Sequence, residues 1–331
     1  TESRHKQAVA ALWNKLKENG HIYSDKYSGW YSVSDEAFFT ADELIDGKAP
    51  TGSKVEWISE ESYFFDLYKW KDKLLQLYES KPNFIFPKWR ANEVINMVKS
   101  DLPDLSISRT TFQWGIPVPN DSKHVIYVWL DALTNYLSVL GYPEENSSEF
   151  QIFWPANAHI MGKDITKFHA IYWPAMLMAA GLPLPTQIVS HGWWTVRGQK
   201  MSKSLKNVVD PVALMQNYGV DQVRYYLMRE ISFGADGEFS EENLVSRANA
   251  ELANKVGNLL QRTLVLTYKN CDKTIPNFHQ SEIRTLYEEN EVLHEASQLL
   301  TKVREEMENY RINHALEHIM AFADQLNNYI D

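Results

Sequence analysis

The chain has 331 residues, enough for two or three domains that each bury a core. No apolar run approaches the roughly 20 residues of a membrane-spanning helix, so no membrane partner is expected, and the formal net charge of −10 argues against a protein that coats nucleic acid. One cysteine, Cys271, excludes an internal disulfide and a multi-cysteine zinc knuckle, so no zinc is predicted.

The N-terminal stretch, residues 1–20, is predicted to form an amphipathic helix that ends at Gly20. Its apolar face consists of Val9, Leu12, Trp13 and Leu16. The stretch is not a signal peptide. Because a mature enzyme seldom begins inside such a helix, we expect further residues upstream.

Residues 21–110 mix aromatic and acidic residues with short turns such as Asp46-Gly47. They are expected to form a small inserted domain, with one helix near 63–80 and another near 89–100. No cysteine occurs in this stretch.

From about residue 111 the pattern changes to strands that alternate with helices. We expect strands at 125–129, 159–161 and 188–190 and helices at 131–140 and 163–180. Pro174 should kink or break the second helix. This alternation predicts an α/β fold with a parallel sheet that binds ligands at the carboxyl ends of its strands.

The remaining chain is predicted to be helical. Asp210 can cap a helix that begins at Pro211, and Gly219 closes it. Residues 240–331 have the spacing of amphipathic helices in an antiparallel bundle.

The strongest chemical signal is the run Lys200-Met201-Ser202-Lys203-Ser204, which follows a turn at Gly198. Two lysines three residues apart on a loop can stabilise the charge that develops on a triphosphate during nucleotidyl transfer. Arg197 and Lys206 extend the run to a local basic patch that permits RNA binding despite the acidic total. The alternative is a basic surface loop without chemistry.

This run resembles the second signature of the class I aminoacyl-tRNA synthetases. Their other signature, His-x-Gly-His, does not occur in the chain. In the family it lies in the first half of the nucleotide-binding fold, so we expect that part upstream. Four further segments resemble the methionine-specific members of the class: Tyr127–Ala132, Gly162–His169, Trp173–Ala175 and His191–Trp194. The similarity extends over nearly the whole chain.

An apolar pocket for a thioether side chain is expected where Trp129 ends a strand and Ile165 and His169 begin a helix. In the resembled family, the corresponding positions line the methionine site: Trp129, Ala132, Tyr136, Ile165 and His169. Leu133 stands where bacterial members have proline, which leaves its contact with methionine open. Core packing is the alternative for Trp129 and Ile165, and a buried core histidine is the alternative for His169.

The resemblance also implies an ATP site. Gly162 lets the ribose approach the backbone, and Asp164 accepts hydrogen bonds from its hydroxyls, unless Asp164 only caps a helix. His191 and the main chain of Trp194 belong to the same site. The signature run adds Lys200, Met201, Ser202 and Lys203, with the two lysines in the catalytic role. Magnesium is expected with ATP, held mainly by the phosphates.

Residues 254–262 resemble the anticodon-reading helix of the family. Asn258 and Arg262 are four apart, so they project from one face and can bind base edges. The polar face of an ordinary bundle helix is the alternative. The implied partners are tRNA(Met), methionine and ATP; no protein partner is evident, and a monomer is expected.

The resemblance thus implies a Rossmann-like catalytic domain with an inserted connective domain and an all-α anticodon-binding bundle. The expected division is 1–20, 21–110, 111–235 and 236–331. The implied activity is methionine–tRNA ligation, and the alternatives are another class I synthetase for a small apolar amino acid or a non-catalytic tRNA-binding fragment. The insertion without cysteine favours the mitochondrial matrix, with the bacterial cytoplasm as the alternative.

Overall fold

The computed structural model describes residues 2–32, 37–39, 41–100, 102–202, 206–277 and 290–330. The chain divides into two compact units, Thr1–Ser190 and His191–Asp331, and each is described by itself. The first unit contains these elements in chain order: α1 (Ser3–Glu18), β1 (Ile22–Ser32), β2 (Ala37–Phe39), η1 (Ala41–Glu43), β3 (Glu56–Phe65), η2 (Leu67–Trp70), α2 (Lys71–Ser80), β4 (Ile85–Phe86), α3 (Lys88–Ser100), β5 (Leu105–Ser106), β6 (Ser108–Arg109), β7 (Pro117–Val118), β8 (Asp121–Ile126), α4 (Val128–Ser138), α5 (Ser148–Phe153), β9 (His159–Gly162), η3 (Lys163–Ile165), η4 (Phe168–Tyr172), α6 (Trp173–Ala180) and β10 (Ile188–His191).

The first helix, α1, forms as its apolar spacing predicts. Its buried face contains Ala8 and the four residues named from the sequence, and Gly20 follows with a φ of +77°. His5 joins α1 to α4, because its ring nitrogens lie 2.6 Å from an Asp131 carboxylate oxygen and 2.8 Å from the Ser138 hydroxyl. The predicted amphipathic helix is confirmed.

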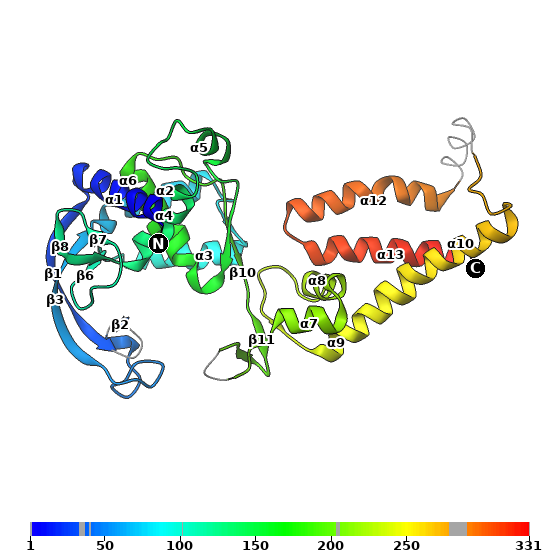
Figure 1. Ribbon diagram of the computed structural model, residues 1–331, viewed down its shortest axis with the longest axis horizontal. Helices are drawn as coiled ribbons and strands as arrows, with labels where there is room; N and C mark the ends of the chain where they lie inside the picture. Colours follow the sequence, from blue (N-terminus) through cyan, green and yellow to red (C-terminus); the bar gives the residue numbers. More distant parts are fainter. Residues whose placement is uncertain are drawn as a thin grey trace. The chain divides into compact units, whose positions relative to one another are not determined.

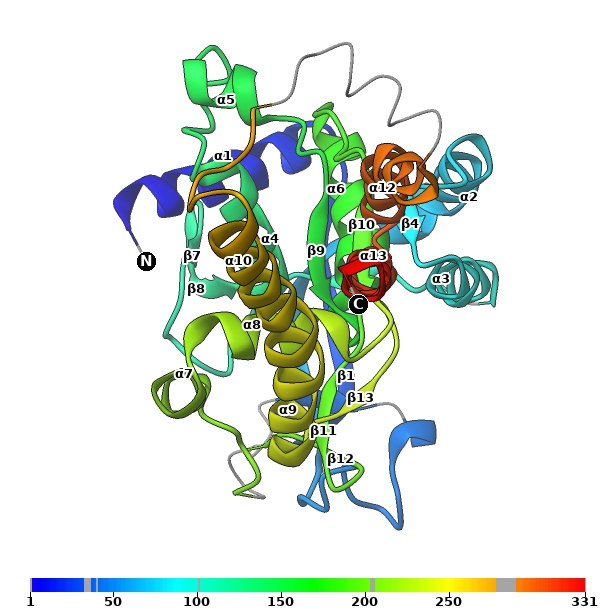
Figure 2. The same cartoon turned by 90° about the vertical axis from the view of Figure 1, so that its right-hand side faces the viewer.

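Three sheets lie among the described residues of the first unit. The largest has the order β2-β1-β3-β5, and its long antiparallel pair β1–β3 is evident in Figure 1. The second has the order β4-β10-β9, with β4 and β10 parallel; Figure 2 shows β9 and β10 next to one another. The third has the order β6-β8-β7 and is antiparallel. The α/β class is confirmed, but the strand near residue 125 belongs to the antiparallel sheet instead of the parallel one.

Two predicted boundaries were wrong. The strand expected at 125–129 ends at Ile126, and Val128 and Trp129 already belong to α4. Tyr127 is extended and its carbonyl accepts the amide of Leu130 at 3.1 Å, so the turn to helix comes earlier than the β-branched run suggests. The helix expected near 63–80 starts only at Lys71, because residues 56–65 pair with β1. In both places strand pairing and helix formation compete, and local spacing does not decide between them.

The predicted break at Pro174 takes the form of a change of helix type. Residues 163–165 are 3-10 helix, Phe168–Tyr172 are π-helix, and α6 begins at Trp173. Proline has no amide hydrogen to donate to the carbonyl four residues earlier, that of Ala170. This carbonyl accepts the Tyr78 hydroxyl of α2 at 2.7 Å instead. The interruption is therefore compensated by a tertiary hydrogen bond.

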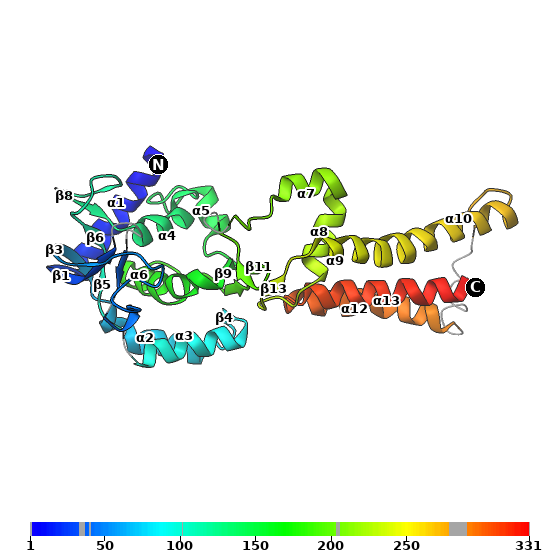
Figure 3. The same ribbon diagram turned by 90° about the horizontal axis from the view of Figure 1, so that it is seen from below.

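The second unit contains β11 (Trp194–Val196), β12 (Gln199–Lys200), α7 (Pro211–Tyr218), α8 (Val220–Arg229), β13 (Gly237–Glu238), α9 (Glu241–Arg247), η5 (Ala248–Gly257), α10 (Asn258–Asn270), α12 (Glu291–Glu308) and α13 (Ile312–Ile330). Asp210 caps α7 as predicted, since its carboxylate accepts the amide of Val212 at 2.9 Å. From α9 on, the described residues are mainly helical, and α12 and α13 run side by side (Figures 1 and 3).

The main core of the first unit draws on distant parts of the sequence. It combines the buried face of α1 with residues from α2, α3, α4 and α6. The helices α2 and α3 and strand β4, which the sequence division placed in the insertion, thus pack with the elements that follow residue 111. The division into four parts stays a prediction.

Candidate functional site

The centre of the predicted pocket is a hydrogen-bonded tyrosine–histidine pair. Helix α4 supplies Tyr136, and the π-helical turn supplies His169, whose Nε2 lies 2.8 Å from the tyrosine hydroxyl. The Nδ1 of His169 lies 3.0 Å from the carbonyl of Ile165. Because a carbonyl oxygen only accepts, Nδ1 carries the proton and Nε2 accepts from Tyr136. Both polar atoms of the ring are therefore engaged, and the ring has a defined orientation.

Burial keeps this pair neutral. His169 is 3% exposed, and burial lowers its pKa, with the hydrogen bond to Ile165 opposing the shift. A second histidine, His159 on β9, stacks on the Tyr136 ring with centroids 4.0 Å apart, and burial together with His169 lowers its pKa to about 4. The Trp173 indole nitrogen donates to Nε2 of His159 at 3.3 Å. The site thus has no positive charge at neutral pH from these two rings.

An aromatic stack lies on the same two elements as this pair. Trp129 of α4 and Phe168 of the π-helix are parallel within 10°, with ring centroids 3.5 Å apart. Trp129, Tyr136 and Ile165 are each half-buried and pack against the main core. The structure therefore brings together four residues that were predicted to line the methionine site, namely Trp129, Tyr136, Ile165 and His169. Their neighbours Phe168, His159 and Trp173 were not predicted from the sequence. Phe168 directly precedes His169 in the sequence, and this adjacency is the signal from which its place at the site could have been predicted.

The other two predicted residues face different surroundings. Leu133 is 1% exposed and belongs to the main core, whereas Ala132 is exposed. Along one helix, positions 132 and 133 differ by about 100° in direction, so one faces the core and its neighbour does not. Whether either contacts methionine stays a prediction.

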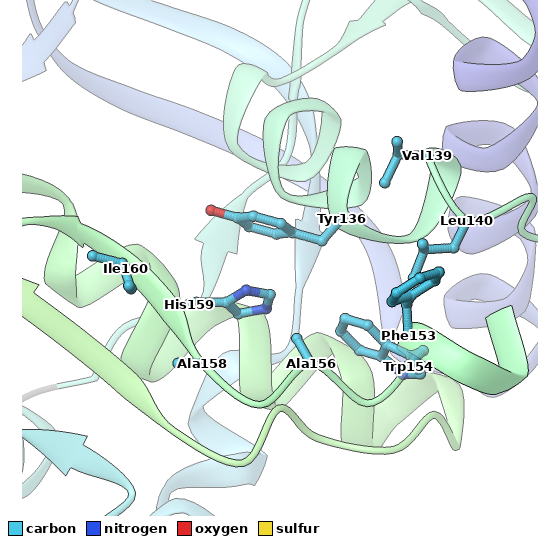
Figure 4. A pocket seen from close by; sticks show the side chains of 9 residues that line it. All are labelled: Tyr136, Val139, Leu140, Phe153, Trp154, Ala156, Ala158, His159 and Ile160. Carbon is cyan, nitrogen blue, oxygen red and sulfur yellow. The ribbon is translucent and has the colours of Figure 1, made fainter. Parts of the chain in front are cut away.

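A cavity of about 350 Å³ lies against the Tyr136–His159 stack. Figure 4 shows its lining, which is mostly apolar: Tyr136, Val139, Leu140, Phe153, Trp154, Ala156, Ala158, His159 and Ile160. Tyr136 is the one predicted site residue in this wall. The Tyr136 side chain thus belongs both to the hydrogen-bonded pair with His169 and to the wall of the cavity.

The ribose residues of the predicted ATP site follow β9. Gly162 ends the strand in an extended conformation, and Asp164 lies exposed in the first turn of the 3-10 helix. The hydroxyls of Thr166 and Ser190, 2.7 Å apart, join this turn to β10. Asp164 is therefore an exposed residue of a segment that is fixed on the sheet.

The remaining predicted ATP residues belong to the second unit. His191 is exposed, and its Nδ1 donates to the carbonyl of Gly192 at 2.8 Å. The Trp194 ring packs in the smaller core beside Tyr226, with centroids 5.6 Å apart. Its side chain is thus used for packing, and the role expected of its main chain stays a prediction.

The signature run begins on a hairpin. β11 and β12 pair antiparallel, and the Lys200 ammonium lies 4.1 Å from the centroid of the Trp193 ring. The Asn207 side chain accepts the amide of Ser202 at 2.8 Å and donates to the carbonyl of Lys200 at 3.2 Å. Met201 and Ser202 are half-buried. Lys203 and Ser204 lie outside the described residues.

The two residues predicted to bind the anticodon differ in their exposure and in their contacts with other helices. Asn258 is exposed at the start of α10. Arg262 is half-buried, and its guanidinium donates to the carbonyl of Asn327 on α13 at 3.1 Å. Lys255 of the preceding η5 binds Asp324 of α13 at 2.5 Å, so η5 and α10 are both joined to α13 on this side. Asn258 is thus the more accessible of the two.

Within the described ranges, no group of three or more His, Cys, Asp or Glu side chains is arranged to hold a metal ion. No helix among the described residues has the length and apolar character needed to cross a membrane.

Comparison with known proteins identifies relatives over the whole chain. A family model described as "tRNA synthetases class I (M)" matches residues 1–56 and 42–264. The chain is 58% identical to a methionine–tRNA ligase of Rickettsia felis, covering 100% of this chain and 64% of the relative. It is 50% identical to the methionine–tRNA ligase of Brucella suis, covering 99% of this chain and 64% of the relative.

A solved structure has the same fold. The methionyl-tRNA synthetase of Mycobacterium tuberculosis bound by methionyl-adenylate superposes with a TM-score of 0.90 at 47% identity. The match covers 99% of this chain and 65% of that one. The chain therefore spans slightly less than two thirds of the length of the relatives it matches.

Proposed function

Because the chain belongs to the class I tRNA synthetase family whose model it matches, we propose that its complete gene product is a methionine–tRNA ligase. The observation that carries this proposal is the neutral Tyr136–His169 pair beside the Trp129–Phe168 stack. These rings offer apolar and polarisable contact without a charge, which suits a thioether side chain. The relatives named above are methionine–tRNA ligases as well.

The proposed reaction has two steps. The methionine carboxylate attacks the α-phosphate of ATP in line, the bond to the β-phosphate breaks, and methionyl-adenylate and pyrophosphate result. A terminal ribose hydroxyl of tRNA then attacks the activated carbonyl and releases AMP. No side-chain nucleophile is needed, since alignment of two bound substrates and stabilisation of phosphate charge lower the barrier. Lys200 and Lys203 are proposed to supply that charge.

The nucleotide is proposed to be bound by the residues that the family resemblance indicates. Asp164 accepts hydrogen bonds from the ribose hydroxyls, and Gly162 gives the ribose access to the backbone. The other proposed ATP residues are His191, Trp194, Lys200, Met201, Ser202 and Lys203. Magnesium would enter with the triphosphate and be held mainly by its phosphates.

Methionine-dependent ATP–pyrophosphate exchange by the complete gene product tests the proposal. We expect exchange with methionine, a strong loss of kcat in Lys200→Met, and no change in Lys269→Met, whose lysine is exposed on α10. Exchange that leucine, isoleucine or valine drives, and methionine does not, would refute the pocket assignment in favour of a sibling synthetase. No exchange with any amino acid, together with tRNA binding, would indicate the non-catalytic alternative.

The anticodon is proposed to meet the exposed start of α10. Asn258→Ala should weaken tRNA(Met) binding at least as much as Arg262→Ala does, because Arg262 already donates to α13. A filter-binding titration of both variants with tRNA(Met) checks this order. Asn270→Ala at the other end of α10 is the control, and equal losses in all three variants would argue against base-specific contact.

The setting we propose is the bacterial cytoplasm. The relatives named above come from Rickettsia, Brucella and Mycobacterium. The mitochondrial matrix expected from the insertion without cysteine gains no specific support from them. We also propose a monomer and the four-part division of the chain, and sedimentation of the complete gene product tests the first of these.

A further inference from the structure

The hairpin that carries Lys200 has an unfavourable turn. Thr195 pairs with Lys200 and Val196 with Gln199, so Arg197 and Gly198 form a two-residue connection. Both have positive φ, +54° and +70°, as a type I′ turn requires. Glycine accepts this conformation readily, but arginine does not, because its Cβ crowds the backbone. Something outside the turn must therefore stabilise it.

A carboxylate from a neighbouring strand supplies this stabilisation. Glu238 on β13 lies beside Thr195, and its Oε2 accepts the Thr195 hydroxyl at 2.6 Å and the Gly198 amide at 3.0 Å. Its Oε1 accepts the amide of Arg197. The Thr195 hydroxyl and the two turn amides lower the pKa of Glu238, so the carboxylate is charged at neutral pH. Charged acceptors form stronger hydrogen bonds than neutral ones.

The register of this hairpin determines where the Lys200 ammonium lies. Lys200 is a diagonal neighbour of Trp193 across the pair, and its ammonium lies 4.1 Å from that ring. Trp193 is itself fixed, since its amide donates to Asp236 at 2.9 Å and its carbonyl accepts the Gly237 amide at 2.9 Å. A slip by one residue would turn Lys200 to the opposite face.

We propose that Glu238 is a positioning residue for nucleotidyl transfer, because it fixes the Arg197-Gly198 turn and thereby the placement of Lys200. The inference rests on the proposed function. Glu238 acts through the backbone of the turn and contributes no contact to the substrates. Its loss therefore affects the rate of the step that Lys200 serves and leaves methionine binding unchanged.

The test compares variants of the complete gene product in methionine-dependent ATP–pyrophosphate exchange. Glu238→Gln should lower kcat by about tenfold to a hundredfold, as small misplacements of reacting groups do, with an unchanged KM for methionine. Arg197→Asn in the same protein should restore most of kcat, because Asn-Gly favours the type I′ turn by itself. Added to Lys200→Met, Glu238→Gln should have no further effect.

Glu241→Gln is the matched control. Glu241 is an exposed carboxylate of the same unit that accepts the Tyr218 hydroxyl of α7 at 2.7 Å. A kcat of Glu238→Gln equal to this control would overturn the inference. So would a loss that Arg197→Asn does not restore, or one that adds fully to Lys200→Met, since a direct or general structural role would then explain it.

Amide hydrogen exchange separates this inference from the proposed function. The Arg197 and Gly198 amides should exchange faster in Glu238→Gln than in the unaltered protein and in Glu241→Gln. If the unaltered protein catalyses no pyrophosphate exchange, the proposed function fails. The rates of amide hydrogen exchange at Arg197 and Gly198 still decide whether Glu238 fixes the turn. Equal amide exchange in all three proteins would overturn the inference.

Discussion

Tyr136→Phe isolates the hydrogen bond at the centre of the site. The change removes only the hydroxyl that donates to His169 at 2.8 Å and keeps the ring that stacks on His159. The Nε2 of His169, a residue that is 3% exposed, then lacks a partner. An unsatisfied buried acceptor costs about 1–3 kcal/mol, and the half-buried Tyr136 position admits some water, so we expect about 1–2 kcal/mol.

Thermal unfolding measures this loss. For a unit of the size of Thr1–Ser190, each kcal/mol lowers Tm by about 2–4 °C, so the first transition should fall by about 2–8 °C. Tyr142→Phe is the control, because Tyr142 is 6% exposed and its hydroxyl has no hydrogen-bond partner in the part of the chain that the structure describes. If both variants unfold at the same temperature, the Tyr136–His169 hydrogen bond does not stabilise the unit and the reasoning is refuted.

Three further predictions concern stability. The stability of the first unit should fall as the pH is lowered from about 6.5 to about 4. Over this range His159 binds a proton in the unfolded chain but not in the folded unit, where its pKa is about 4. His159→Gln should flatten this dependence of Tm on pH. Leu133→Ala should cost about 2–5 kcal/mol in urea unfolding, since Leu133 is 1% exposed, whereas Ala132→Ser next to it should change little. Glu251→Ala should cost about 1–3 kcal/mol in the second unit, because Glu251 is 8% exposed and binds Arg247 at 3.1 Å, whereas Arg247 keeps its ion pair with Glu230 at 2.6 Å; a cost no larger than that of Glu241→Ala would contradict this.

Much of the local structure could be predicted from the sequence. The apolar spacing of α1, the Asp210 cap before Pro211 and the strand at residues 188–190 all form as expected. Each depends on neighbours within about one turn or a few residues of strand, which the sequence lists in order. The signature run from Lys200 likewise indicated the family, because it specifies consecutive residues.

The contacts that define the site join residues far apart in the sequence. Tyr136 meets His169 across 33 positions, Glu238 reaches the Gly198 amide across 40, and Tyr78 reaches Ala170 across 92. No local pattern encodes such pairs. Pro174 illustrates the difference: the missing amide is visible in the sequence, but the Tyr78 hydroxyl that compensates the freed carbonyl is not.

The sequence by itself thus determined which segments favour helices or strands and which residues carry charge or aromatic rings. The tertiary structure alone decided that residue 129 is helical, that β8 joins an antiparallel sheet, and that Leu133 faces the core while Ala132 faces solvent. The physical reason is that strand pairing, burial and the proton position on His169 depend on partners brought in by folding. A carboxylate such as Glu238 has no visible role until β13 lies beside β11.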